Sequence, residues 1–437
     1  MAFHLALGFI LFQFNFLSKF YLFAICFYFL YRIVSTSNRN DEVLVAAGYV
    51  MGFEVLSRMT GGAITYEFAK YAVIGFILIG MLYKGFKKSS WPYILYMVLL
   101  VPGIIYSAIN LNYDTNVANA IGFNLSGPFC LGIAALYCYK KRIELKKLEI
   151  ILMAILLPLI SITVYVFLYS PNVRDVLSGT ASNFGASGGF GPNQVSTVLG
   201  LGAFILLSRI LLIKNSAINI IDIALLGAMG YRALITFSRG GVITAVACGI
   251  IFIFIFLLKM NISKRIKFFP KLVFIISLFF GIWFVSTYAT LGLIANRYAN
   301  EDASGREKET LASGRAAIFQ TELAAFKENP LTGIGVGKSK EYRKEKISVE
   351  AASHNEISRL LSEHGLFGLI ALLILLFTPL FIYLTNKSNI FLLPFLCFWF
   401  LTINHSSMRI AAPAFIYALC LLNLDYAPKK KPALHRK

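Results

Sequence analysis

Apolar segments separated by short polar turns recur along most of this chain. A helix that crosses a membrane needs about 20 mostly apolar residues, and the pattern predicts about 12 to 14 crossings. The segments are residues 3–17, 20–34, 43–56, 67–83, 91–109, 125–139, 148–169, 194–213, 219–237, 242–258, 270–292, 365–384, 390–404 and 408–424. The first three are short, so the first 60 residues are also compatible with a broken or re-entrant helix.

Lysine and arginine gather in alternate loops, and this asymmetry predicts the orientation. Short cytoplasmic loops collect basic residues because their translocation is disfavoured. Basic residues concentrate near 32–39, 84–88, 140–147, 209–214, 259–271 and 387 and in the tail at 429–437. Among the opposite loops, residues 110–124 contain no Lys or Arg, and residues 171–193 contain only Arg174. We therefore expect both termini in the cytoplasm; Lys19 and Arg58 are exceptions within the uncertain N-terminal region.

One stretch, residues 292–364, breaks the apolar pattern because it is long, polar and rich in charge. A structureless loop of that length is unusual, so we expect it to fold and to carry function. The sequence thus predicts an all-α, polytopic transmembrane bundle with one large extracytoplasmic loop that contains amphipathic helices. The expected parts are a transmembrane bundle at 1–291, the loop at 292–364, C-terminal transmembrane helices at 365–426 and a basic cytoplasmic tail at 427–437.

Composition supports the membrane class and narrows the partners. Hydrophobic residues make up 58% of the chain and charged residues only 14%, which excludes an ordinary soluble domain. The formal net charge of +20 belongs mostly to the basic loops, where it favours anionic membrane lipids and not nucleic acid. The six cysteines all fall inside apolar segments, so neither a disulfide framework nor a metal motif is indicated.

Within the polar loop, the stretch that begins at Ser313 has the apolar periodicity of a helix. Ser313 is placed to cap its start, and Asn329 with Pro330 to stop it, which gives an amphipathic helix lying on the membrane with Arg315 in its first turn. The apolar positions that recur on one face are Ala316, Phe319, Leu323 and Phe326. Three glycines follow, at 333, 335 and 337; they suit a backbone that approaches a phosphate or sugar, although a plain turn explains them more simply.

A second signal is the sequence SHNEISRLLSEHGLFG at residues 353–368. Ser353 and Glu356 have the spacing of a capping box, which would place His354 and Asn355 in the first turn of a helix. Gly365 would then allow a turn before the next membrane helix. Free amide groups at a helix N-terminus favour a bound anion and a neutral imidazole, so His354 is a candidate general base.

A third signal is Ser238-Arg239-Gly240-Gly241, at the extracytoplasmic end of an apolar segment. An arginine at membrane depth costs about 2.5 to 3.5 kcal/mol unless it has a partner. A diphosphate suits the planar fork of Arg239, and the two glycines would open a backbone pocket beside it. Arg232, about two turns earlier, is a further candidate for the same ligand.

Taken together, these motifs resemble the O-antigen ligase and polymerase superfamily. His354-Asn355, nine further residues, Gly365, two residues and Gly368 follow that family's pattern. Three more of its motifs occur upstream in the same order: Ser-Arg-Gly-Gly, Ser313-Gly314-Arg315 and the Asn-Pro-Leu-x-Gly-x-Gly run at 329–335. The resemblance covers residues 219 to about 370.

The resemblance implies a bacterial inner-membrane glycosyltransferase of the GT-C type that uses neither a metal nor another cofactor. Its donor would be a glycan on undecaprenyl diphosphate, bound at the periplasmic face. By motif position, His354 would activate the acceptor hydroxyl, and Arg239 and Arg315 would hold the diphosphate. The acceptor would be lipid A core in a ligase of lipopolysaccharide biosynthesis, or a second lipid-linked repeat in a polysaccharide polymerase. The N-terminal helices carry no family motif, so acceptor recognition is not implied.

Five further residues are candidates for substrate binding, each with a plain structural alternative. They are Asn355, Arg232, Asn193, Gln194 and Arg409. Asn193 and Gln194 open an apolar segment, where they suit either sugar hydroxyls or a helix cap. An arginine at a helix end, including Arg239, can also simply snorkel to the membrane surface. The rival from another class is a transporter of lipid-linked sugar that performs no chemistry; it needs broken or charged helices at mid-membrane, often within an internal repeat, and no convincing repeat is found.

Overall fold

The structure is a computed structural model that describes residues 1–112, 115–308, 313–350, 353–385 and 387–426. The chain is an α-helical bundle, as predicted, with one short parallel pair of strands, β1 (Arg142–Glu144) and β2 (Asn423–Asp425). The helices of the N-terminal half are α1 (Ala2–Gln13), α2 (Leu17–Thr36), α3 (Glu42–Met59), α4 (Phe68–Lys84), α5 (Trp91–Leu99), α6 (Val101–Asn110), α7 (Val117–Cys138), α8 (Leu145–Tyr169) and α9 (Pro192–Leu212).

The second half continues the bundle and adds the helices of the polar loop. Its helices are α10 (Ser216–Ile235), α11 (Arg239–Leu258), α12 (Ile262–Ala289), α13 (Leu293–Ala299), α14 (Ser313–Glu328), α15 (Lys338–Ile347), α16 (Glu356–Thr385), α17 (Leu392–His405) and α18 (Ala411–Cys420). Short 3-10 turns lie at Lys88–Ser90, Val173–Val176 and Gly185–Ser187. Each predicted apolar segment therefore corresponds to helical structure.

Within the described residues, nine helices are long and apolar enough to cross a membrane, fewer than the 12 to 14 predicted. Five predicted segments fall outside this count: α3 has 18 residues but carries three charged ones, and α1, α4, α17 and α18 are shorter than 18 residues. α1 has 12 residues, and at 1.5 Å per residue it reaches about 18 Å, well short of a hydrocarbon core of about 30 Å. α17 and α18, with 14 and 10 residues, are also short. These apolar helices complete the bundle without having the length of a full span.

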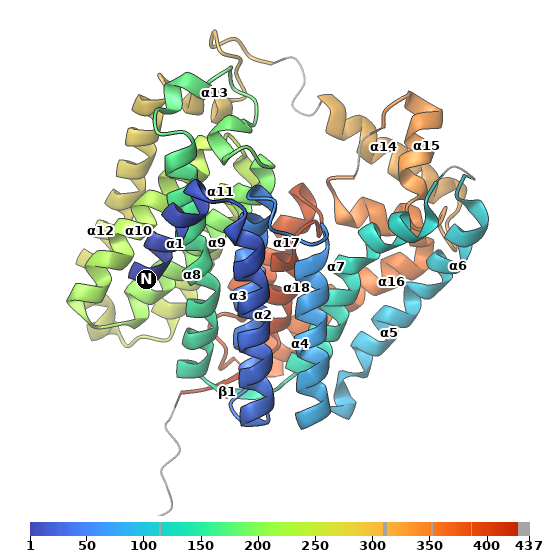
Figure 1. Cartoon of the computed structure of the whole chain (residues 1–437), viewed down its shortest axis with the longest axis horizontal. Coiled ribbons are helices and arrows are strands. Elements are labelled where there is room, and N and C mark those ends of the chain that lie inside the picture. Colours follow the sequence, from blue (N-terminus) through green and yellow to red (C-terminus); the bar gives the residue numbers. More distant parts are fainter. Residues whose placement is uncertain (113–114, 309–312, 351–352, 386, 427–437) are drawn as a thin grey trace, which may run out of the picture.

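The loops that carry most of the basic residues gather at one end of the molecule (Figure 1). Asp41 forms ion pairs with Lys84 at 2.9 Å and Lys141 at 3.0 Å, which joins three of these loops. Lys259 donates to the carbonyl of Lys387 at 2.7 Å, which joins two more. α13, α14 and α15 of the polar loop lie at the opposite end (Figure 1). This segregation is the arrangement that the charge pattern predicted.

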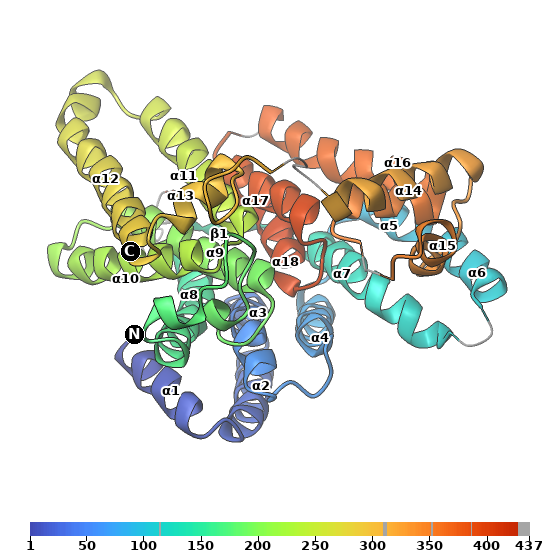
Figure 2. The same ribbon diagram turned by 90° about the horizontal axis from the view of Figure 1, so that it is seen from above.

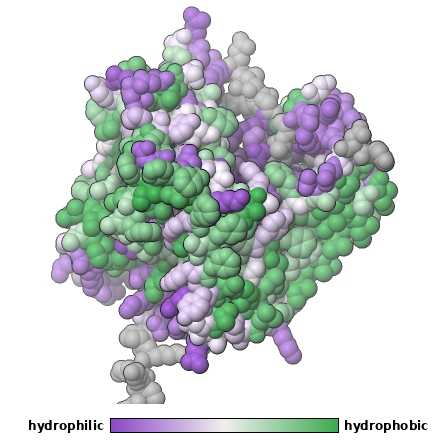
Figure 3. All heavy atoms as spheres, viewed as in Figure 1, coloured by the Kyte–Doolittle hydropathy of each residue, from purple (hydrophilic) through white to green (hydrophobic). Residues whose placement is uncertain are grey.

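Between the two ends, hydrophobic side chains form a broad outer band, with hydrophilic atoms above and below it (Figure 3). α12 contributes strongly to this band because Phe280, Phe284 and Tyr288 are each at least 70% exposed. α9 and α18, in contrast, are buried at the centre of the bundle. Such an exposed apolar belt around a buried core is the surface expected of a protein in lipid.

The helices of the polar loop pack in two places: α13 lies against α12, and α14 and α15 pack against α16. α16 bends sharply at Gly365, whose φ of 59° and ψ of −135° are readily accessible only to glycine. A Cβ at Gly365 would lie 2.6 Å from the backbone of Leu331, so the bend also accommodates the chain that follows α14. The bend separates the first turns of α16, which belong to the polar loop, from its long apolar part, as the sequence predicted.

Candidate active site

His354 lies immediately before α16, where Asn355 is the N-terminal cap. The Asn355 side-chain oxygen accepts hydrogen bonds from the backbone N–H groups of Ile357 at 2.8 Å and Ser358 at 3.3 Å. The predicted capping box of Ser353 and Glu356 is therefore wrong. The Ser353 hydroxyl donates to the Asn355 carbonyl at 2.9 Å, and the Glu356 carboxylate pairs with an arginine one turn later. His354 thus precedes the helix, although it remains at the N-terminal end.

The segment that carries His354 is anchored to the chain between α17 and α18. The Ser353 carbonyl accepts hydrogen bonds from Arg409 Nη2 at 2.8 Å and from the Ser407 hydroxyl at 3.3 Å. Asn355 Nδ2 donates to the side-chain oxygen of Asn404 at 3.1 Å. These bonds flank His354 on both sides and fix its backbone. Asn355 and Arg409 therefore position the site, whether or not they also contact a ligand.

A buried carboxylate, Glu322 of α14, holds the same segment from the other side. Its side chain is 1% exposed and accepts hydrogen bonds from Arg343 Nη1 at 2.6 Å, Ser358 Oγ at 2.5 Å and Ser353 Oγ at 3.3 Å. Burial raises the pKa of Glu322, while the hydrogen bond from Ser358 and the charge of Arg343 oppose that shift. The sequence analysis did not single out Glu322. The position could have been noticed because Glu322 lies three residues after Phe319 and four before Phe326, on the same face of the helix.

The imidazole of His354 is kept neutral by its surroundings. Burial lowers its pKa to about 4, and the positive charges of Arg409, Arg315 and Arg343 contribute in that order. Its buried Nδ1 atom has no hydrogen-bond partner among the residues that the structure describes. A neutral imidazole keeps one unprotonated ring nitrogen, which is the form that can accept a proton from a hydroxyl.

Arg239 and Arg315 form a cationic cluster with Arg297 of α13. Arg239, the first residue of α11, donates to the Arg297 carbonyl at 3.3 Å, and Arg297 Nε donates to the Phe237 carbonyl at 3.1 Å. Burial lowers the pKa of both Arg297 and Arg315, and the charge of Arg239 lowers each further. Three guanidinium groups from separate elements therefore influence one another, and the charge of Arg315 also reaches His354.

This cationic cluster lacks compensating negative charge in the described part of the chain. No ion pair there joins Arg239, Arg297 or Arg315 to a carboxylate. Each of the other arginines close to His354 has one or more fixed protein partners, such as Glu322 for Arg343. Uncompensated guanidinium groups at a partly desolvated site favour a polyanionic ligand, because they can bind its oxygens in a bidentate manner.

The remaining predicted residues have protein partners that explain them structurally. Asn193 accepts a hydrogen bond from the Ser238 hydroxyl at 2.7 Å and so supports the turn before Arg239. Gln194 accepts from Arg58 Nη1 at 3.0 Å and donates to the Tyr66 hydroxyl at 2.9 Å. Both side chains are therefore held by hydrogen bonds within the protein.

Arg232 is separate from the cationic cluster. It is 1% exposed and donates to the Ser170 carbonyl at 2.9 Å and to the Ser170 hydroxyl at 3.2 Å. Its guanidinium also lies 4.1 Å from the centre of the Phe167 ring. Because these partners are at the C-terminal end of α8, Arg232 neutralises the free carbonyls of that helix.

The glycines serve close packing. A Cβ at Gly240 would lie 2.3 Å from the His405 ring, and one at Gly241 would lie 2.4 Å from the Ser196 backbone. The backbone pocket expected beside Arg239 is therefore filled by α9 and α17. Similarly, a Cβ at Gly333 would lie 2.4 Å from the Glu363 backbone, so the glycine run after α14 is a packed turn.

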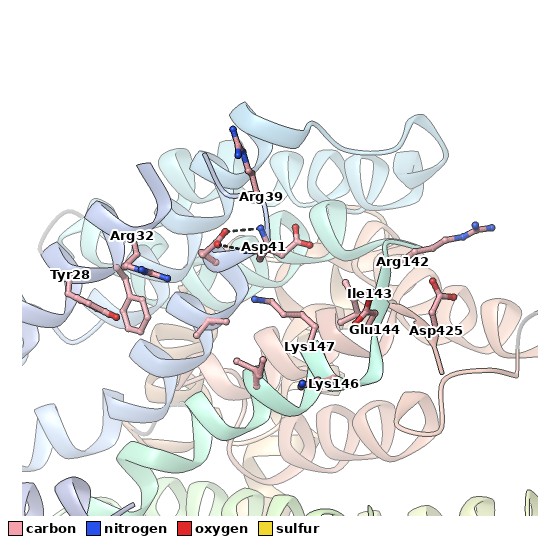
Figure 4. A pocket seen from close by; sticks show the side chains of 15 residues that line it. Tyr28, Arg32, Arg39, Asp41, Arg142, Ile143, Glu144, Lys146, Lys147 and Asp425 are labelled. Carbon is pink, nitrogen blue, oxygen red and sulfur yellow. Dashed lines mark hydrogen bonds between the residues drawn. The ribbon is translucent and has the colours of Figure 1, made fainter. Parts of the chain in front are cut away.

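A pocket of about 800 Å³ lies at the other end of the molecule, among the basic loops (Figure 4). Arg32, Arg142 and Lys147 line it together with Asp41 and Glu144, which project from α2, β1, α8 and the chain around them. Its alternating charges are partly self-compensating, and it is separated from His354 by the length of the bundle. It is not part of the candidate active site.

Comparison with known families agrees with the geometry. Residues 224–373 match the family described as O-Antigen ligase, and this range contains Arg239, Arg297, Arg315 and His354. The match agrees with the resemblance found in the motifs, over this part of the chain. None of the curated proteins and none of the solved structures gave a significant match.

Proposed function

We propose that this protein transfers a glycan from undecaprenyl diphosphate to an acceptor hydroxyl in the manner of an O-antigen ligase. The family match supports glycosyl transfer at a membrane by an enzyme of ligase or polymerase type. The observation that carries the specific proposal is a neutral histidine beside three arginines that form no ion pair with any carboxylate in the described part of the chain. A base and a diphosphate site side by side are the two functions that this transfer requires.

In the proposed reaction, His354 takes the proton of the acceptor hydroxyl. The acceptor oxygen then attacks the anomeric carbon of the donor, and the bond from that carbon to the diphosphate oxygen breaks. The electron pair leaves with the diphosphate, whose added negative charge is stabilised by Arg239, Arg315 and Arg297. These arginines take the charge-neutralising role of a metal, so we propose that none is required. A single displacement inverts the anomeric carbon, and product NMR that showed retention would contradict it.

An apolar cavity beside the cationic cluster supports a polyprenyl donor. It is an open cavity of about 860 Å³ on the outer surface of α9, α10, α11 and α12, and its lining is almost entirely apolar. Tyr298, which follows Arg297, closes one end by packing edge-on against Trp283 at 5.0 Å. Val242, which also lines the cavity, is less than one helical turn from Arg239. An amphiphile with an isoprenoid tail and a diphosphate head matches this sequence of apolar and cationic surfaces.

The family also contains polymerase-type chemistry, in which a second lipid-linked repeat replaces lipid A core as acceptor. The same base and the same diphosphate site serve both reactions. We take the ligase version as the main proposal because the matched family is described as an O-antigen ligase. Supplying the two acceptors separately to the purified protein distinguishes the two versions.

We also propose that His354 faces the periplasm and that both termini are cytoplasmic, in the bacterial inner membrane. Support comes from the basic loops, which gather at the end away from the polar loop (Figure 1). An impermeant thiol reagent should label Lys346→Cys once the outer membrane is opened, and Lys146→Cys only after the inner membrane is also opened. The reverse labelling pattern would reverse the orientation.

The decisive experiment is turnover by purified protein in nanodiscs given lipid-diphosphate glycan and acceptor, with chelator and without ATP. Wild-type protein should form product, and His354→Ala should lose about a hundred- to ten-thousand-fold in rate, as expected when a general base is removed. The thermal unfolding temperature of His354→Ala is the control, and a value close to that of the wild type shows that the loss of rate is not a loss of folding. Undiminished turnover by His354→Ala would refute the assigned base, and transport without product would favour the transporter.

A further inference from the structure

A second cavity, of about 790 Å³, lies between the first turns of α7 and α15. These helices stand on the opposite side of the upper end from α11 and α13, which carry Arg239 and Arg297, whereas α14, which carries Arg315, lies beside α15 (Figures 1 and 2). We call this cavity the α7–α15 groove. It shares no lining residue with the apolar cavity between α9 and α12.

Side-chain amides dominate one wall of the α7–α15 groove. Its four asparagines are Asn112, Asn116, Asn119 and Asn124. Asn116 caps α7, and Asn124 accepts from Arg359 Nη1 at 2.8 Å, so these two amides are fixed in place. The Asn119 side chain forms no hydrogen bond with any residue that the structure describes. An amide offers both donors and an acceptor, which is the combination that sugar hydroxyls require.

An aromatic ring lies beside these amides. Phe123 lines the groove, is 41% exposed and lies between Asn119 and Asn124 on α7. Its ring is 5.9 Å from that of Tyr66, which is 39% exposed. The apolar face of a pyranose ring packs well on such a surface, while its hydroxyls reach the neighbouring amides.

The charged residues of the groove neutralise one another. Lys340 pairs with Glu350 at 2.9 Å, Arg343 pairs with Glu322 at 2.6 Å, and Arg359 pairs with Glu363 at 3.3 Å. The arginine cluster on the other side of His354 has no such compensation in the described residues. The groove is therefore suited to a ligand that forms hydrogen bonds and carries little charge, and the cluster to the diphosphate.

The groove leads toward His354. A narrow cavity of about 30 Å³ continues from it and shares Phe123, Asn124 and Ser353 with it. Arg409 lines the far side of this narrow cavity and donates to the Ser353 carbonyl at 2.8 Å, next to His354. Ser353, which lines both the groove and the narrow cavity, directly precedes His354, so the groove ends within one residue of the proposed base.

We infer that the α7–α15 groove binds the glycan of the acceptor and directs one of its hydroxyl groups to His354. This inference rests on the proposed glycosyl transfer and adds a site for the second substrate. It divides the two substrates between opposite sides of the histidine, with the diphosphate donor near α11 and the acceptor near α7.

The test uses the full chain in nanodiscs and two variants, Asn119→Ala and Phe123→Ala. Loss of one hydrogen bond or one stacking contact should raise the acceptor KM about tenfold in each variant, with kcat and the donor KM within about twofold of wild type. Asn261→Ala and Phe254→Ala are matched controls, because both residues are exposed and lie outside the groove. A rise in the donor KM, or no change in the acceptor KM, would overturn the inference.

A binding arm separates this inference from the proposed chemistry. The probe is the lipid-free core oligosaccharide released from lipopolysaccharide by mild acid, followed by saturation-transfer NMR on protein that carries His354→Ala. Saturation transfer that is lost on adding Phe123→Ala supports the groove even if no transfer reaction is found. Saturation transfer that persists in both groove variants overturns the inference, and so does its absence from the protein that carries His354→Ala alone. Either result leaves the proposed diphosphate site unaffected.

Discussion

The imidazole of His354 is surrounded by guanidinium groups that come from three different elements. Arg315 belongs to α14, Arg343 to α15, and Arg409 to the chain between α17 and α18. Short motifs in the sequence predict His354, Arg239 and Arg315 as site residues. The sequence could not identify Arg343 or Arg297, since their effect depends on which helices pack together. A residue's charge environment is a property of the fold, whereas its motif is a property of the local sequence.

The pH dependence of transfer should reflect this environment. Burial and the neighbouring cations lower the pKa of His354 to about 4, so the neutral base predominates from pH 5 upward and is lost only as the pH falls through that value. We therefore expect kcat/KM for the donor, which reports the enzyme before the diphosphate binds, to be level between pH 5 and 7. The acid limb of kcat should lie at higher pH, because bound diphosphate offsets the arginine charges. A kcat/KM profile that halves near pH 6.5 would show an ordinary imidazole.

The arginines should separate into ligand-binding and structural groups. Arg239→Ala and Arg315→Ala each remove charged hydrogen bonds to phosphate, which are worth about 1.5 to 3 kcal/mol, so kcat/KM for the donor should fall about ten- to a hundred-fold. Arg232→Ala is the matched comparison, since that side chain is bound to the end of α8. It should lower the thermal unfolding temperature and leave the donor KM of the folded fraction unchanged. Equal donor defects in all three variants would contradict this division.

At the scale of elements, α14 shows what periodicity determines and what it leaves open. The predicted helix is confirmed, but the predicted apolar positions are not its buried face: Phe319 is 45% exposed, whereas Ile318, Thr321 and Glu322 are buried. In a membrane protein the apolar face can turn toward lipid and the polar face toward protein, which reverses the rule for soluble helices. The sequence also placed the start of α16 wrongly, because several polar residues there can each cap a helix.

Glu322 should therefore couple α14 to the active-site segment. Glu322→Ala leaves Arg343 and two serine hydroxyls without their buried partner, and breaking such a pair typically costs about 3 to 5 kcal/mol. We expect lower resistance to denaturant and faster hydrogen exchange at Ser353 to Ser358. Glu328→Ala is the control, because its pair with Lys346 is half exposed and should contribute little. Unchanged exchange in the Glu322 variant would show that α14 does not hold His354 in place.

At the scale of the whole molecule, hydropathy and charge were sufficient to predict the class and its two unlike ends. The positions of the apolar segments held throughout, because each must satisfy its backbone hydrogen bonds as a helix. Hydropathy did not predict the number of helices that are long enough to span the membrane. A short apolar helix such as α1 is stabilised by its neighbours and need not match the thickness of the bilayer. The cavities also could not be predicted, because each is lined by residues from distant parts of the sequence.

The apolar cavity between α9 and α12 makes a prediction about the length of the donor lipid. Val246 lines the cavity and is 41% exposed, so Val246→Trp should fill space that a polyprenyl chain needs. We expect the donor KM for an undecaprenyl diphosphate glycan to rise about tenfold, which corresponds to about 1.4 kcal/mol, or two buried methylene groups. A donor with a short isoprenoid tail should be affected much less, because it reaches less of the cavity.

Val273→Trp provides the matched control for that substitution, since Val273 is 46% exposed on α12 and lies outside the cavity lining. It adds the same bulk to the membrane surface and should leave both donor KM values unchanged. Equal effects of Val246→Trp on long and short donors would place the polyprenyl chain elsewhere. Because the diphosphate would remain with Arg239 in either case, this comparison tests the path of the lipid tail separately from the site of reaction.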